Sequence, residues 1–111
     1  MMANLVKTVI SSGLWAGHYS ELDGDGTLIC QRMKIEFANN VILGEGDEYV
    51  PGETFFIVGN YNIRENWFQC TKGFIDGRIT TYFGRFRDKE IYGSWWIHGQ
   101  RGGSFRLWPG N

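Results

Sequence analysis

Apolar side chains recur at every second position from Gly13 onward, and glycines share that phase with aromatic rings. In the stretch IYGSWWI, Gly93 stands between Ile91 and Trp95 in one phase of the alternation. A period of two indicates β-strands rather than helices. The 16 glycines among 111 residues are about twice the usual frequency of roughly 7%. Glycines on the ring-bearing face suit the narrow interior of a closed barrel, where small residues make room for large ones.

Turn-forming residues separate the alternating runs. The runs cover residues 13–20, 31–38, 40–46, 54–63, 79–87, 90–98 and 103–108, and a further strand is expected around Lys72. The turns contain Gly, Asn, Asp or Pro and lie at residues 23–26, 38–40, 50–53, 64–66, 75–77, 87–90 and 100–103. Short loops make neighbouring strands antiparallel. The sequence therefore predicts an all-β, antiparallel, up-and-down barrel of about eight strands.

Residues 13–111 are predicted to form this single barrel domain, preceded by an N-terminal segment of residues 1–12. Within that segment, residues 3–11 have helical spacing, because their apolar side chains fall on one side of a helix. A chain of 111 residues is long enough to bury one core without metals or disulfides.

Seven short motifs follow one another along the barrel-forming part. They are W-x-G-x-Y from Trp15, M-x-I-x-F from Met33, I-x-G-x-G from Ile42, F-x-I-x-G-x-Y from Phe55, Y-x-G from Tyr82, I-x-G-x-W from Ile91 and G-x-F-x-L from Gly103. Their order resembles the small calycin-like barrels, the group of lipocalins, fatty-acid-binding proteins and avidins. The GLW at residues 13–15 is similar to the G-x-W that opens the first lipocalin strand. The resemblance implies a calycin-like fold that binds a ligand inside the barrel, but no particular ligand: the lipocalin C-terminal helix and the ligand-binding residues of avidin have no counterparts here.

The net charge, the hydropathy and the cysteine content limit the partners, the location and the metal sites that this protein is expected to have. The net charge of −1 argues against a nucleic-acid partner, whose binding face usually needs a basic excess. No apolar run reaches the ~20 residues of a membrane-spanning helix, and the start of the chain is a poor secretion signal, so a cytoplasmic protein is expected. Cys30 and Cys70 have neither CxxC spacing nor adjacent histidines, which predicts two buried free thiols and no metal site.

The phase that carries the rings is expected to face the barrel interior. Its candidate ligand-binding residues are Trp15, Tyr19, Gln31, Met33, Phe55, Tyr61, Tyr82, Trp95 and Phe105. Gln31 and the tyrosine hydroxyls would orient a flat or apolar ligand; alternatively, the rings pack on one another and fill the core. The favoured function is a non-enzymatic protein that holds a hydrophobic or aromatic small molecule, with no cofactor.

Charged residues leave two questions open. The phase of the strand around Lys72 is ambiguous because Trp67 and Phe68 are adjacent, so this lysine is either exposed or an inward cation paired with a carboxylate. The acidic run at residues 45–53 could cap the barrel mouth or bind a cation weakly, but a solvated loop is favoured. A third possible function is an enzyme of the barrel cyclase or isomerase kind. Such an enzyme would need a polar group with a shifted pKa deep inside the barrel, and the candidates are limited to Gln31, Lys72 and the tyrosines. This function is the least favoured of the three, and no catalytic residue is predicted.

Several large apolar side chains occupy the opposite, outward phase. They are Leu43, Phe56, Val58, Phe83, Tyr92 and Trp96. A contiguous exposed apolar patch usually marks an interface. The alternative function is therefore a protein-interaction or structural module that assembles through its outer wall as a homodimer or higher assembly. In a monomer, the N-terminal segment could instead cover this patch.

Overall fold

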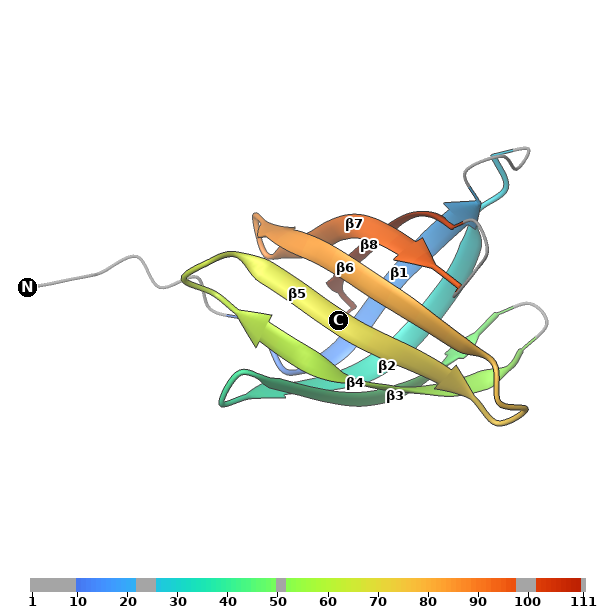
Figure 1. Cartoon of the computed structure of the whole chain (residues 1–111), viewed down its shortest axis with the longest axis horizontal. Coiled ribbons are helices and arrows are strands. Elements are labelled where there is room, and N and C mark those ends of the chain that lie inside the picture. The colour runs from blue at the N-terminus through green and yellow to red at the C-terminus, as the bar shows by residue number, and fades with distance from the viewer. Residues whose placement is uncertain (1–9, 22–25, 50–51, 98–101, 111) are drawn as a thin grey trace, which may run out of the picture.

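The computed structural model describes residues 10–21, 26–49, 52–97 and 102–110. It contains eight strands: β1 (Gly13–Glu21), β2 (Ile29–Ala38), β3 (Val41–Glu48), β4 (Thr54–Asn62), β5 (Trp67–Phe74), β6 (Ile79–Arg87), β7 (Glu90–Trp96) and β8 (Gly103–Pro109). Each strand pairs with the next in antiparallel order, and β8 pairs with β1 to close the sheet (Figure 1). The predicted all-β, up-and-down barrel is confirmed.

Most of the N-terminal segment lies outside the described residues. Residues 1–9 are not described, so the helix predicted over residues 3–11 lies almost entirely outside the described residues. Residues 10–12 belong to no helix or strand, and Ile10 packs against the barrel core. Three of the predicted turns are described only in part, because residues 23–25, 50–51 and 100–101 also lie outside the described residues.

Two hairpins show the turn chemistry directly. Asn39 and Asn40 have φ angles of +52° and +67°, and Asp88 and Lys89 have φ angles of +52° and +71°. Two consecutive left-handed residues make a type I′ turn, whose twist matches that of the flanking strands. Asparagine and aspartate tolerate this conformation because their short polar side chains can hydrogen-bond locally. These turns fix the register of the β2–β3 and β6–β7 pairs.

The core follows the predicted alternation. Fully buried side chains come from all around the barrel and include Trp15, Ile35, Ile42, Phe55, Phe68 and Ile91. The structure also settles the phase of β5, in which Phe68, Cys70, Lys72 and Phe74 point inward. Cys30, by contrast, is exposed on β2, so the prediction of two buried thiols is wrong for this residue, whose position alternates with the buried Gln31.

The inward glycines allow adjacent strands to approach closely. A Cβ atom on Gly93 would lie 2.5 Å from the Cα of Gly84, its partner on β6, and one on Gly59 would lie 2.6 Å from the Cα of Cys70 on β5. The expectation that glycines make room for rings holds at Gly84, where a Cβ atom would lie 2.9 Å from the Phe105 ring, but it needs correction at Gly93 and Gly59. At these two positions, strong coiling brings the backbone of the neighbouring strand into the space that a side chain in place of the glycine would fill.

Candidate functional site

A pocket of about 220 Å³ opens at the end of the barrel where β1, β5 and β7 finish (the right-hand end in Figure 1). We call it the barrel mouth. It is lined by Tyr19, Glu21, Ile29, Lys72, Phe74, Arg78, Thr80, Tyr82, Trp95 and Ile97. Aromatic and aliphatic walls with a few polar groups are the usual composition of a small-molecule site, and barrel mouths are a common place for one.

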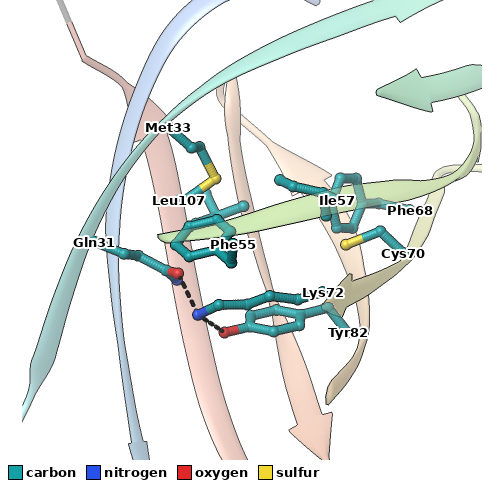
Figure 2. A pocket seen from close by; sticks show the side chains of 9 residues that line it. All are labelled: Gln31, Met33, Phe55, Ile57, Phe68, Cys70, Lys72, Tyr82 and Leu107. Carbon is teal, nitrogen blue, oxygen red and sulfur yellow. Dashed lines mark hydrogen bonds between the residues drawn. The ribbon is translucent and has the colours of Figure 1, made fainter. Parts of the chain in front are cut away.

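Lys72 forms the floor of the barrel mouth and is only 3% exposed. Its Nζ donates hydrogen bonds to Glu48 Oε2 at 2.6 Å, to Gln31 Oε1 at 2.8 Å and to the Tyr82 hydroxyl at 3.3 Å. Figure 2 shows the bonds to Gln31 and Tyr82. Three acceptors match the three N–H groups of an ammonium. Of the two possibilities left open by the sequence, the inward cation paired with a carboxylate is the one that the structure shows.

The carboxylate is Glu48, which is 4% exposed, so the prediction that residues 45–53 form a solvated loop is wrong at this position. The strand β3 continues to Glu48, which pairs with Gln31 on β2. The inward phase that runs through Ile42, Gly44 and Gly46 therefore reaches Glu48 as well. Tyr19 donates a further hydrogen bond from its hydroxyl to Glu48 Oε2 at 2.7 Å.

Aromatic rings surround the Lys72 ammonium. Its Nζ lies 4.3 Å from the ring centroid of Phe55, 4.7 Å from that of Tyr19 and 5.2 Å from that of Phe74. Each of these distances is within the range of cation–π attraction. Burial lowers the pKa of Lys72 because desolvation disfavours the charged form, and the bond to Glu48 opposes that shift.

Burial acts in the opposite direction on the neighbouring acids. It raises the pKa of Tyr82 well above its usual value, and it also raises the pKa of the Cys70 thiol. The pKa of Tyr19 is raised by burial first and by the Glu48 carboxylate second. These groups therefore remain protonated at neutral pH, so the Lys72–Glu48 pair supplies the charge at the floor of the mouth.

Below the floor, the barrel interior is almost filled. The cavity drawn in Figure 2 has a volume of only about 10 Å³, about one probe sphere and so room for a single water. Gln31 lines this cavity, and its Nε2 is the buried side-chain atom for which the described residues provide no hydrogen-bond partner. The deep interior is thus a packed core with one unpaired donor.

The predicted ligand-binding residues all lie on the inner side but separate into groups. Seven of the nine are buried, and Tyr19 and Tyr61 are half-buried and pack against the core. Tyr19, Tyr82 and Trp95 line the mouth, whereas Gln31, Met33 and Phe55 line the small cavity with Tyr82. The other three, Trp15, Tyr61 and Phe105, are core residues that line neither space.

The predicted outward residues also separate into two groups. Leu43, Phe56 and Val58 lie on β3 and β4 and are each more than half exposed. Phe83, Tyr92 and Trp96 lie on β6 and β7, where Phe83 is half-buried. Gln69 and Thr71, which β5 presents outward, lie between the two groups. Outward polar side chains of β5 therefore lie between the two groups.

Four outward residues on β1 to β4, the side of the barrel that carries the first group, align in a regular row. Leu14, Lys34, Glu45 and Phe56 are register partners across β1, β2, β3 and β4. All four point outward and are exposed. Shallow grooves of about 480 and 490 Å³ run beside this row. The β2–β3 wall, defined by this row, thus has the order apolar, positive, negative, apolar.

The fold and the site together define a closed eight-stranded antiparallel barrel whose open mouth ends on a buried lysine–glutamate pair. Comparison with known proteins adds no relative: no family model matches the chain, and neither curated proteins nor solved structures gave a match. The described part of the chain has no helix that is long and apolar enough to cross a membrane. Nor do the described residues bring three His, Cys, Asp or Glu side chains together in a way that could hold a metal ion.

Proposed function

We propose that the protein is a calycin-like binding protein that holds one small hydrophobic or aromatic molecule, without enzymatic turnover, in the barrel mouth. The eight-stranded up-and-down topology supports the calycin-like assignment. The observation that carries the proposal is the pocket of about 220 Å³ with walls of Tyr19, Phe74 and Trp95. Its volume lies below the range of about 300–1,000 Å³ that drug-sized ligands occupy, so the ligand is small, of one or two rings.

The charge balance of the mouth favours a neutral ligand. Lys72 is already paired with Glu48, and Arg78 at the rim is paired with Glu53 and Asp76. The remaining carboxylate of the lining, Glu21, is exposed to solvent. A charged ligand would have to break one of these pairs or rely on this solvated carboxylate, and it would lose its own hydration. An uncharged ring system needs only to displace water from the apolar walls, and this displacement favours binding.

Filling the mouth is expected to weaken binding. Replacing Ile97, which lines the mouth, with tryptophan should weaken the binding of 2-naphthalenemethanol at least about tenfold, a change of about 1.4 kcal/mol. Isothermal titration calorimetry measures this affinity. Ile79→Trp is the matched control because Ile79 is 57% exposed and lies outside the mouth, so this variant should bind like the original protein. Equal affinity in both variants, or no binding of 2-naphthalenemethanol to the original protein, would contradict the proposal.

A second candidate function is self-association through the β2–β3 wall, and the row of Leu14, Lys34, Glu45 and Phe56 supports it. Consider two copies whose β2–β3 walls face each other. A twofold axis at their interface, parallel to the strands and midway between β2 and β3, would place Lys34 opposite Glu45 of the second copy. The same rotation would place Leu14 opposite Phe56. The row is therefore complementary to itself in charge and in apolar character, as a twofold interface requires. We propose the homodimer on this basis.

Charge reversal tests the dimer. Lys34→Glu and Glu45→Lys should each be monomeric, because each variant places like charges opposite one another. An equimolar mixture of the two variants should dimerise again, because each row then meets its complement. Size-exclusion chromatography with light scattering gives the molar masses. A monomeric original protein at every concentration, or a mixture that stays monomeric while the original protein dimerises, would refute this interface.

A further inference from the structure

The mouth holds a nucleophile that simple binding does not require. Among the described lysines, Lys34 and Lys89 are exposed, whereas Lys72 is buried at the bottom of the pocket. A lysine amine in apolar surroundings, next to a group that can take its proton, is the arrangement that activates lysine for attack on a carbonyl group. Glu48 Oε2, 2.6 Å from Nζ, is such a group.

We propose that the ligand of the mouth is an aldehyde or ketone with an apolar or aromatic body, and that Lys72 captures it as an imine. This inference rests on the proposed ligand site in the mouth. Lys72 lines both the mouth and the small cavity beneath it, so the carbonyl end of a ligand that enters from the mouth would reach Nζ first.

Gln31 supplies the second argument for a carbonyl group. Its side chain is 2% exposed, and its Oε1 accepts from Lys72 Nζ at 2.8 Å. Its Nε2 interacts with the Tyr82 hydroxyl closely enough to oppose the rise in the pKa of that tyrosine, but it has no acceptor at full hydrogen-bond geometry among the described residues. A buried donor without an acceptor costs free energy that a ligand oxygen can recover. A carbonyl oxygen that takes the place of the one water for which the small cavity has room would meet this N–H, which would polarise the C=O bond.

The reaction balances with the groups present. The Lys72 ammonium gives a proton to Glu48, and the Nζ lone pair then attacks the carbonyl carbon. The C=O electrons move to oxygen, which takes a proton from the attacking nitrogen and becomes the hydroxyl of a carbinolamine. The nitrogen lone pair then forms the C=N bond, while the hydroxyl takes back the proton held by Glu48 and leaves as water. An ammonium and a carbonyl thus become an iminium and one water, and the iminium keeps Glu48 as its counterion.

The surroundings of Nζ favour both steps. Burial lowers the pKa of Lys72, which increases the fraction of free amine. The rings of Phe55, Tyr19 and Phe74 keep bulk water away from the nitrogen, and this slows hydrolysis of the imine. The pair with Glu48 stabilises the charged iminium in the way that it stabilises the ammonium.

Reductive trapping tests this proposal on the intact chain. The protein is incubated with 2-naphthaldehyde and sodium cyanoborohydride at neutral pH, and the adduct is located by mass spectrometry of peptides. The expected adduct adds the mass of the aldehyde less one oxygen atom. Lys72 should carry at least about ten times more label than Lys34 or Lys89, because the mouth holds the aldehyde beside Nζ and the attack on a bound carbonyl is effectively intramolecular.

Two variants and one ligand separate the possible failures. Lys72→Arg should lose the adduct, whereas Lys34→Arg should keep it. Label on Lys34 and Lys89 but not on Lys72, together with calorimetric binding of 2-naphthalenemethanol, would overturn the imine and leave the proposed function intact. Absence of both binding and label on Lys72 would overturn both proposals. The location of the label in the original protein is decisive even if Lys72→Arg fails to fold.

Discussion

Replacing Glu48 with leucine is expected to lower the free energy of unfolding by about 3–5 kcal/mol, because it leaves the buried Lys72 ammonium without its counterion. The two side chains are 4% and 3% exposed, so solvent cannot replace the lost partner. Tyr19 also loses the acceptor of its hydroxyl. Urea denaturation followed by tryptophan fluorescence measures the change.

The double variant Glu48→Leu/Lys72→Met is expected to recover most of this loss. A buried ion pair that is replaced as a whole by apolar side chains of similar size is often neutral for stability, because the desolvation of both charges disappears with them. The double-mutant cycle should therefore give a favourable coupling energy of about 3 kcal/mol, at the upper end of the range for residues in contact. If the losses of the two single variants simply add in the double variant, the pair is not the unit that we describe.

Glu65→Leu provides the matched control. Glu65 lies in the turn between β4 and β5 and is exposed, so its replacement should change stability by no more than about 0.5 kcal/mol. A loss at position 48 that does not exceed the loss at position 65 would show that Glu48 is solvated.

The sequence predicts the barrel because its most regular feature is the one that determines the fold. Alternation in runs such as residues 31–38 identifies the inward side chains, and the short turns leave only antiparallel neighbours. The type I′ turn at Asn39 and Asn40 is what such a short connection requires. In β5 the same reasoning fails, because Trp67 and Phe68 are both large and apolar and give the strand no clear phase.

The centre of the site could be predicted only in part. Gln31 and Tyr82 belong to clear inward phases. Glu48, by contrast, follows two glycines in an acidic run, and the acidic composition predicts a solvated loop more strongly than the alternation predicts an inward side chain. Continuing the phase of Ile42 by three further alternations would have reached it. The pair with Lys72 joins residues 24 positions apart, which only the closed sheet brings together. The small volume of the deep cavity depends on side-chain packing, which no periodicity encodes.

Replacing Gly93 with alanine is expected to cost about 3 kcal/mol or more, at or above the upper end of the usual range for overpacking. The new Cβ would lie 2.5 Å from the Cα of Gly84 and closer still to the carbonyl oxygen of Phe83. Both atoms belong to the backbone of β6, so no side-chain rotation can relieve the clash, and the β6–β7 pair must move apart. Thermal unfolding followed by circular dichroism measures the loss, at roughly 4 °C for each kcal/mol.

Gly73→Ala separates this steric effect from a general effect of losing a glycine. Gly73 points outward from β5, and a Cβ there would meet only the Phe56 ring, at the ordinary contact distance of 3.6 Å. Alanine at this position should leave stability unchanged or raise it by up to about 1 kcal/mol, because it restricts the unfolded chain. If the two substitutions have similar effects, close approach between neighbouring strands is not the reason that this barrel needs its inward glycines, and the strands are less tightly coiled than the structure shows.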